Sequence, residues 1–314
     1  MSDASYELPP LPERDPEGHK GTFGTVAVFG GCAHAGGEAG PGRMMIGAPA
    51  LAAIAALRAG AGLAHIAAPA PVLATILGVA TSATGTPLPV DGEGRVVPHL
   101  AAAAFDRVAS GADCLAVGPG LGSDEGGRAL TVRALAQGET PVVLDADGLN
   151  HLAGLPDAHL DIVAPTVLTP HPGEFRRLAE ATGVGVRASE DAVGAAGDLA
   201  RRLGCVVVLK GAKTVVSDGH ACWVHAGMNP ALATGGSGDV LTGVIAGLVA
   251  QFHARGIRIP GREQGLPLLA CSCWGVRLHA AAGALWAEAH AGRAGLLAQE
   301  LADLVPAARD RLSP

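Results

Sequence analysis

The chain has 314 residues, and 22 basic side chains against 29 acidic ones give it a formal charge of −7. This acidity argues against a protein that binds nucleic acid by neutralising phosphates. Apolar residues make up 49% of the chain and charged residues 16%, below the roughly 25% charged residues of an average domain. The composition therefore predicts a sizeable core and excludes disorder for most of the chain.

The first 18 residues form a polar, proline-rich segment without the basic and apolar regions of a signal peptide. We expect 1–18 to be a flexible or surface-hugging lead and 19–314 to form one domain, with the protein in the cytoplasm. The apolar stretch 240–252 is too short to span a bilayer, so no membrane segment is expected. The six cysteines show no repeating pair spacing, which indicates reduced core residues rather than disulfides.

Short apolar runs bounded by glycine, proline or aspartate alternate with helical stretches in the first two thirds of the chain. This alternation predicts a mostly parallel sheet with helices on both faces. After Lys210, two adjoining strands at 214–216 and 221–225 are expected to pair antiparallel, and helices dominate from Asp239 onward. The other expected strands are 25–29, 114–117, 142–144, 162–168 and 206–209, and the expected helices include 47–59, 125–137, 173–181, 190–203, 266–288 and 296–309.

Five loops follow predicted strands at the edge where open α/β sheets bind ligands, beyond the carboxyl ends of the strands. They are 30–31, 118–122, 145–150, 169–174 and 210–214. Residues 118–122 match a dinucleotide fingerprint only weakly, so a plain turn and a close approach to a ligand both stay open. Asp145 and Asp147 are candidates for a metal, a ribose or simple turn capping. His171, between two prolines, is expected to contact a ligand.

The sharpest motif is ATGGSGD at 233–239, followed at once by the apolar stretch 240–252. Its three glycines allow consecutive backbone N–H groups to turn toward one anion, and the following helix adds its positive dipole end. A phosphate is the natural ligand. Asp239 could cap the helix, but a carboxylate beside a phosphate site is better explained as a general base that takes a proton from an attacking hydroxyl. Ser237 does not stand in a G-x-S-x-G nucleophile motif, and no G-K-[ST] phosphate loop or paired zinc motif occurs.

Seven motifs in order together resemble the ADP- or ATP-dependent NAD(P)H-hydrate dehydratases, over about His19 to Pro306. They are HKGTFGTVAVFGG at 19–31, GAPALAA with AALRAGAGL within 47–63, GPGLG at 118–122, LDADGLN at 144–150, LTPHPGEF at 168–175, VLKGAKT at 208–214 and NPALATGGSGDVLTGVIAGL at 229–248. The resemblance implies a ribokinase-like α/β/α fold with a central, mostly parallel sheet, in agreement with the pattern of elements.

The resemblance also implies a repair lyase. Such enzymes transfer phosphate from ADP or ATP to the ring hydroxyl of the S epimer of hydrated NADH or NADPH (NADHX, NADPHX), then eliminate it to restore NAD(P)H. Mg²⁺ is expected to bridge the nucleotide's phosphates, its protein ligands being unknown. Relatives form homo-oligomers, often tetramers, and a separate NAD(P)HX epimerase is the expected functional partner.

By motif position, the resemblance assigns roles to individual residues. Asp239 deprotonates the hydroxyl, while the backbone of Gly235, Gly236, Ser237 and Gly238 stabilises the transferring phosphoryl group. Contacts to the hydrated nucleotide fall on Ala48, Gly122, His171 and Asp239. Contacts to the adenine nucleotide fall on Lys210, Gly211, Ala212, Lys213, Thr214 and Gly238.

The chain departs from the family pattern at three places. Segment 32–46 is longer than the usual loop, the frequent GNPG is replaced by GMNPA at 227–231, and the customary HGxAGD reads HAAAGA at 279–284, without the aspartate. A kinase of the same superfamily acting on a vitamin-precursor alcohol, and a silent nucleotide-binding sensor, are the alternatives. Only three of the 22 basic residues are lysines, Lys20, Lys210 and Lys213. Their place in two of the motifs suggests that all three mark the nucleotide side of the site.

Overall fold

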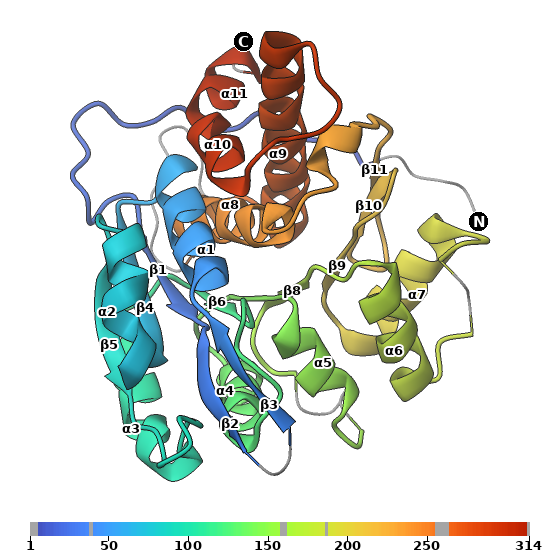
Figure 1. Ribbon diagram of the computed structural model, residues 1–314. Coiled ribbons are helices and arrows are strands. Elements are labelled where there is room, and N and C mark those ends of the chain that lie inside the picture. The colour runs from blue at the N-terminus through green and yellow to red at the C-terminus, as the bar shows by residue number, and fades with distance from the viewer. Residues whose placement is uncertain (1–5, 38–39, 158–161, 186–187, 255–263, 313–314) are drawn as a thin grey trace.

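The protein was analysed as a computed structural model, which describes residues 6–37, 40–157, 162–185, 188–254 and 264–312. Its centre is a nine-stranded sheet with the order β11-β10-β9-β8-β7-β6-β1-β4-β5 (Figure 1). The seven strands from β9 to β5 in this order run parallel to one another. At the other edge, β10 runs antiparallel to both of its neighbours, β9 and β11. The strands are β1 (Thr25–Phe29), β4 (Leu63–Pro69), β5 (Thr84–Leu88), β6 (Cys114–Val117), β7 (Val142–Leu144), β8 (Thr166–Leu168), β9 (Val206–Leu209), β10 (Thr214–Ser217) and β11 (Cys222–His225).

Helices cover both faces of this sheet. Alternate residues of β1 point to opposite faces, so Val26 and Val28 join one apolar cluster while Ala27 and Phe29 join the other. The first cluster contains α1 (Gly47–Arg58), α2 (Ala70–Val79), α8 (Ser237–Phe252), α9 (Leu268–His290), α10 (Ala298–Asp303) and α11 (Val305–Leu312). The second contains α3 (Pro98–Ala109), α4 (Glu125–Ala136), α5 (Asp147–Ala153), α6 (Pro172–Thr182) and α7 (Ala192–Leu203). The expected three-layer α/β/α fold is confirmed.

Several element predictions need correction. The strand expected at 162–168 contains only Thr166–Leu168, because the amides of Val163 and Ala164 donate to the carbonyl of Leu135 instead of to the sheet. The helix expected at 296–309 is two helices, α10 and α11, that meet at Leu304. No element was predicted for 63–109, where the structure has β4, α2, β5 and α3.

The long segment 32–46 is not an irregular loop. It forms a hairpin of β2 (Cys32–Gly37) and β3 (Gly40–Met45), which pair only with each other in a separate two-stranded sheet (Figure 1). The hairpin starts directly after β1 and returns to α1. It therefore leaves the carboxyl edge of the central sheet.

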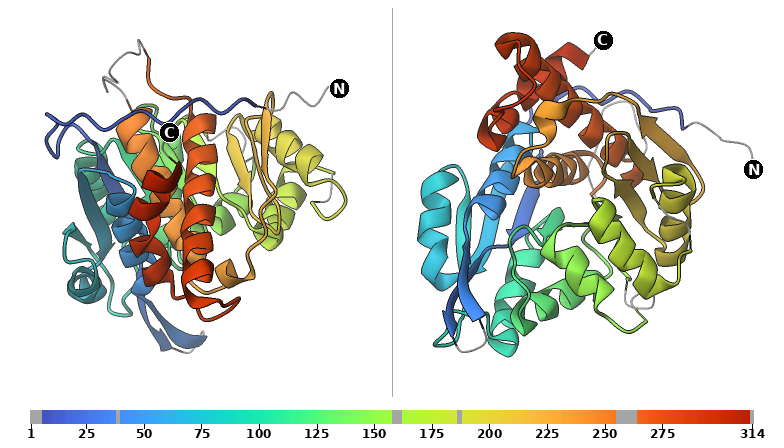
Figure 2. Two further views of the ribbon diagram at one scale, coloured as in Figure 1. Left: turned by 90° about the horizontal axis from the view of Figure 1, so that it is seen from above. Right: turned by 45° about the vertical axis from the view of Figure 1, so that its right-hand side comes forward.

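Residues 6–18 adopt the surface-hugging alternative expected for the lead. Figure 2 shows this blue segment crossing the face that carries the orange and red helices. The carbonyl of Pro9 accepts a hydrogen bond from Trp274 Nε1 at 2.8 Å, and Arg14 donates to the carbonyl of Gly60 at 2.7 Å. Tyr6, whose amide donates to the carbonyl of Cys222, packs on the first apolar cluster.

Helix α9, unlike the shorter stretch 240–252, is long and apolar enough to cross a membrane by length and composition. However, 67% of its most apolar window is buried within the protein, mainly against α8, α10 and α11. We therefore describe it as a core helix of the fold. All six cysteines are free, as expected, and all but the half-buried Cys222 are buried.

Candidate active site

The motif 233–239 forms the start of α8, as predicted. The residue that caps the helix is Gly236, whose φ of +88° lies in the left-handed region that favours glycine. A Cβ at Gly236 would also lie only 2.8 Å from both Ala298 Cβ and Leu51 Cδ1. The capping glycine has no side chain to pair with the first amides of the helix. The amide of Ser237 lies 3.4 Å from the carbonyl oxygen of Thr234, and the amides of the first turn, which have no partner within the helix, can donate to an anion.

Asp239 is the third residue of α8 and makes no capping hydrogen bond. The alternative in which Asp239 caps the helix is therefore wrong. Burial, and secondly the negative charge of Asp145, raise the pKa of Asp239 to about 7, while Lys210 acts in the opposite direction. A carboxyl group with a pKa near the physiological pH is well suited to accept a proton in a reaction.

Lys210, at the end of β9, provides the positive charge of the site. Its Nζ donates to Asp145 Oδ1 at 2.8 Å and lies 3.9 Å from Glu174 Oε2. Burial alone would lower the pKa of Lys210, but the carboxylates of Asp145 and Glu174 raise it above the ordinary value. A Cβ added at Gly238 would lie 3.4 Å from this Nζ. The ammonium group therefore borders the glycine loop at the α8 end.

Asp145, 2% exposed, is held by three donors from three different elements. Oδ1 accepts hydrogen bonds from Lys210 and from Thr169 Oγ1 at 2.7 Å, and Oδ2 accepts one from Thr242 Oγ1 at 2.8 Å. Because β7, β8 and β9 are adjacent parallel strands, the residues that follow them meet at one edge. This network joins that edge to α8.

His171 and Glu174 form a reciprocal cap at the start of α6. His171 Nδ1 accepts from the amide of Gly173 at 2.9 Å, and Glu174 Oε2 accepts from the amide of His171 at 2.8 Å. Because Nδ1 is an acceptor, the neutral ring carries its proton on Nε2, which lies 3.3 Å from Glu174 Oε1. Burial, and secondly Lys210, lower the pKa of His171, while burial raises the pKa of Glu174 to about 7.

Gly122 and Ala48, both expected to contact the hydrated nucleotide, lie on either side of the base of the hairpin. The amide of Gly122 donates to Asp147 Oδ2 at 2.9 Å, and its carbonyl contacts His151 Nε2 at 2.9 Å. A Cβ at Gly122 would lie 3.2 Å from Cys32 Cβ. Ala48, 9% exposed, lies beside Gly120 of the same loop, since a Cβ at Gly120 would lie 3.3 Å from Ala48 Cβ.

A residue with a strained backbone lies between the side chains around Lys210 and those around Gly122. Ala146, between Asp145 and Asp147, has φ +48° and ψ −117°, a conformation that non-glycine residues rarely adopt. Such a conformation costs about 1–3 kcal/mol and persists where the surroundings enforce it. The strain directs one carboxylate toward Lys210 and the other toward the Gly122 amide. The contact of Asp147 is thus with the 118–122 loop and not with its own turn.

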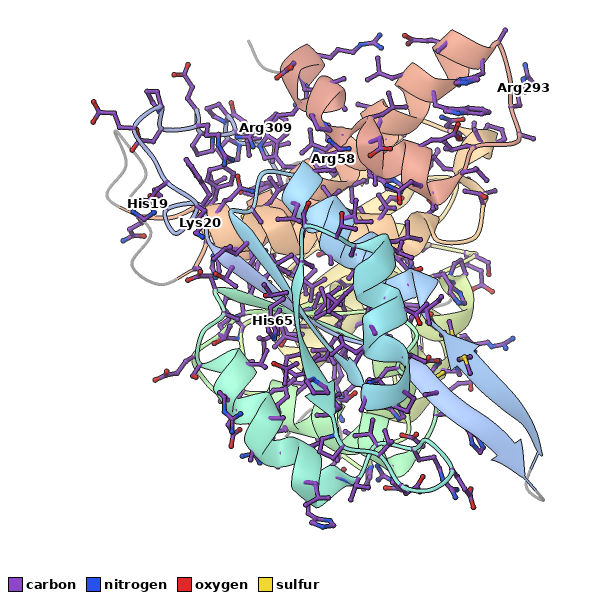
Figure 3. All side chains as sticks on the ribbon, turned by 60° about the vertical axis from the view of Figure 1, so that its left-hand side comes forward. His19, Lys20, Arg58, His65, Arg293 and Arg309 are labelled. Atoms are coloured by element: carbon purple, nitrogen blue, oxygen red, sulfur yellow. The ribbon has the colours of Figure 1, made fainter. Side chains whose placement is uncertain are left out.

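The expectation for Lys20 is wrong. A Cβ at Gly62 would lie 1.7 Å from the carbonyl oxygen of Lys20, and Gly62 directly precedes β4. Lys20 is thus at the amino edge of the sheet, opposite the edge where Asp145 and Lys210 lie. Figure 3 shows it beside His19, far from the hairpin. There it lines a cavity of about 440 Å³ with Arg14 and Phe23.

The remaining residues assigned to the adenine nucleotide, Gly211, Ala212, Lys213 and Thr214, form the turn between β9 and β10. The first three are exposed and Thr214 is half-buried. Sequence reasoning missed Glu174, Thr169 and Thr242 as parts of the network around Lys210. It also missed the contact of His279 with Ser237, which joins positions 42 residues apart without any local signal.

Known proteins match most of the chain. The family model described as NAD(P)H-hydrate dehydratase matches residues 40–307. The chain is 36% identical over 314 residues to the ADP-dependent (S)-NAD(P)H-hydrate dehydratase of Xanthomonas campestris, covering 99% of this chain and 96% of that one. It is 39% identical to the bifunctional NAD(P)H-hydrate repair enzyme Nnr of Salinibacter ruber, over 94% of this chain but only 50% of the relative. The chain thus spans about half the length of the bifunctional relatives.

Solved structures show the same relationship. The ADP/ATP-dependent NAD(P)H-hydrate dehydratase of Bacillus subtilis, co-crystallised with ATP and Mg²⁺, superimposes with a TM-score of 0.73 at 31% identity, covering 96% of this chain and 94% of that one. A ribokinase-like superfamily protein of Enterococcus faecalis, 21% identical, has a TM-score of 0.74 over 96% of this chain and 92% of that one and shares the fold. By sequence and fold, the chain belongs to the NAD(P)H-hydrate dehydratase family.

Proposed function

We propose that this protein dehydrates the S epimer of hydrated NADH or NADPH at the expense of ADP or ATP. The observation that carries the proposal is the position of Asp239. Its carboxyl group, with a pKa of about 7, lies at the uncapped start of α8, where Lys210 also places its ammonium group. A base, an anion-binding helix end and a buried cation are the groups that phosphoryl transfer to a hydroxyl requires.

The reaction proceeds in two stages. Asp239 takes the proton of the ring hydroxyl, whose oxygen attacks the terminal phosphoryl group, and the bond from that phosphorus to the nucleotide breaks. The amides of Gly235, Gly236, Ser237 and Gly238, with Lys210, stabilise the charge on the phosphoryl oxygens. In the second stage the ring carbon–oxygen bond breaks, the neighbouring ring carbon loses a proton, and phosphate leaves. NAD(P)H is thereby restored, because phosphate is a far better leaving group than hydroxide.

The two substrates approach the base from opposite sides. Gly122, Ala48 and the Nε2–H of His171 are the proposed contacts for the hydrated nucleotide. The turn 210–214 and Gly238 are the proposed contacts for ADP or ATP. The relative from Xanthomonas campestris is named ADP-dependent, and the Bacillus subtilis dehydratase was co-crystallised with ATP and Mg²⁺.

The proposed magnesium ion is one that the nucleotide itself brings. No group of three or more His, Cys, Asp or Glu side chains suited to a metal occurs among the residues that the structure describes. Asp145 already accepts three hydrogen bonds. Mg²⁺ commonly uses one or two carboxylates together with phosphate oxygens and water, so the phosphates of the bound nucleotide and water would supply most of its ligands. When bound, Mg²⁺ neutralises charge on the phosphates.

Three further properties belong to the same proposal: a single domain over 19–314 that works in the cytoplasm, assembly into a homotetramer, and a separate NAD(P)HX epimerase as partner.

The test is to incubate the protein with hydrated NADH and either ADP or ATP, in the presence of Mg²⁺, and to follow the absorbance of the dihydronicotinamide. We expect recovery only when a nucleotide is present, with one equivalent of AMP or ADP formed. Asp239→Asn serves as the inactive control. Absence of nucleotide-dependent recovery would refute the dehydratase activity. Phosphorylation of a vitamin-precursor alcohol would then support the kinase alternative, and nucleotide binding without turnover would support the sensor.

A further inference from the structure

His279 joins helix α9 to the anion-binding start of α8. Its Nε2 lies 3.0 Å from the backbone oxygen of Ser237 and also 3.0 Å from the hydroxyl oxygen of the same residue. Ser237 is buried and belongs to the glycine loop that faces the proposed phosphoryl group. His279 also begins the segment HAAAGA, a motif to which the proposed chemistry gives no role.

The contact defines which atoms carry the protons. A backbone carbonyl oxygen can only accept a hydrogen bond, so Nε2 of His279 must carry a hydrogen and donate it. Burial lowers the pKa of His279 to about 4, so the ring is neutral at physiological pH and keeps this single arrangement. The ring therefore does not add a positive charge to the phosphate site.

The same proton arrangement determines the direction of the Ser237 hydroxyl. Since Nε2 already carries a hydrogen, it cannot accept the hydroxyl hydrogen, and the serine oxygen is the acceptor on that side. Within the part of the chain that the structure describes, His279 is the partner recorded for this hydroxyl. The hydrogen of the Ser237 hydroxyl is then available to donate to a ligand bound in the glycine loop.

We propose that His279 is a positioning residue for phosphoryl transfer. Its Nε2–H holds the carbonyl and hydroxyl oxygens of Ser237, so that the hydroxyl hydrogen is directed to the terminal phosphoryl group of the nucleotide. This proposal rests on the proposed function, but it also makes a claim about binding. Ser237 donates to the terminal phosphoryl group of ADP, a group that AMP lacks.

The first experiment measures binding, without any turnover. We expect His279→Met and Ser237→Ala each to weaken ADP binding about tenfold, the equivalent of one hydrogen bond to a charged group. AMP binding should stay within twofold, which also shows that the variants fold. His279→Gln, whose side-chain amide can donate in place of Nε2–H, should restore most of the ADP affinity. His290→Met, a histidine of the same helix that hydrogen-bonds Trp286, is the matched control and should change neither affinity.

The second experiment is a double-mutant cycle on the rate constant. Removing one donor to a developing anion costs about 10²-fold in kcat, so His279→Met should lower kcat by roughly that factor, and His279→Gln by less than about fivefold. In a Ser237→Ala background, His279→Met should cost less than about threefold, because the group through which it acts is gone. The ¹⁵N spectrum of the ring should show a neutral Nε2–H tautomer down to about pH 5.

Three results would overturn the proposal: equal losses of ADP and AMP affinity in His279→Met, an Nδ1–H tautomer, or full additivity of the two substitutions. Each would indicate a purely structural link between α8 and α9. Failure of the proposed function is recognised separately. A wild-type protein that binds ADP more tightly than AMP but does not restore NAD(P)H would refute the dehydratase activity, while the binding experiment would still decide the role of His279.

Discussion

The Nζ of Lys210 lies 2.8 Å from Oδ1 of Asp145, although the two residues are 65 positions apart in the chain. They follow β9 and β7, and Thr169, which follows the intervening β8, donates to the same carboxylate. The sheet order therefore assembles the charged centre of the site. Because both groups are largely buried, removing one of them leaves the other without its ion-pair partner.

Lys210→Met should destabilise the protein by about 3 kcal/mol, because it leaves the Asp145 carboxylate buried without its cation. The free energy of unfolding from urea titrations measures this loss. Lys213→Met, on an exposed residue three positions further on, is the control and should change it by less than about 0.5 kcal/mol. Adding Asp145→Asn to Lys210→Met should recover part of the loss; a double variant no more stable than Lys210→Met would contradict the ion-pair explanation.

Gly236→Ala should destabilise the protein by about 2 kcal/mol and disorder the glycine loop. The added Cβ meets both a left-handed backbone and two atoms at 2.8 Å. The matched control is Gly235→Ala, since a Cβ there has no neighbour within 4 Å. Thermal unfolding of the two variants under the same conditions tests the comparison. Equal melting temperatures would show that the loop is not held as described.

Asp239→Asn should lower kcat at least about 10³-fold while nucleotide affinity changes only severalfold, since the amide has nearly the same shape but takes no proton. For the wild type, the base must be ionised, so kcat/KM should rise with pH and level off above about 7, the pKa of Asp239. Kinetics between pH 5 and 9 and calorimetric titration with ADP provide both measurements. Substantial turnover by Asp239→Asn would assign the base to another residue.

The raised pKa of Asp239 also predicts how stability depends on pH. Its pKa is about 7 in the folded state against 3.8 ordinarily, so the folded state holds the proton over that range while the unfolded state loses it. The contribution of this group to stability is therefore greatest below about pH 4 and is lost as the pH rises to 7. Asp239→Asn should become progressively more stable than the wild type between pH 5 and 8. A difference that does not change with pH would contradict the raised pKa.

Much of the fold could be predicted from the sequence, and the misses have physical causes. The apolar runs of β1, β6, β7 and β9 coincide with the observed strands because each is buried on both faces. Strand β4 was missed because LAHIAAP is rich in alanine, which has little preference for strands. Its place is determined by hydrogen bonds to β1 and β5 on either side, which are not visible locally.

For the site, the glycine loop and its aspartate were recognisable because a short segment carries the whole motif. Lys210 was assigned to the adenine nucleotide together with Gly238, and the structure places its ammonium group close to Gly238; the contact with Asp145 could not be predicted locally. Lys20 was predicted on the wrong side of the molecule, because a motif specifies residue types but not the edge of the sheet at which each residue lies. The partner of Ser237 comes from α9, and only tertiary packing of α8 on α9 brings His279 to it.

The hairpin of β2 and β3 has a consequence for variation among related chains. Its strands pair only with each other, so adding or removing residues at its tip leaves the register of the nine-stranded sheet unchanged. Its base is different, because Cys32 and Met45 lie against Gly122 and Gly120. Related chains should therefore differ freely in the length of this segment. They should keep small residues in the 118–122 loop, against which the base of the hairpin packs.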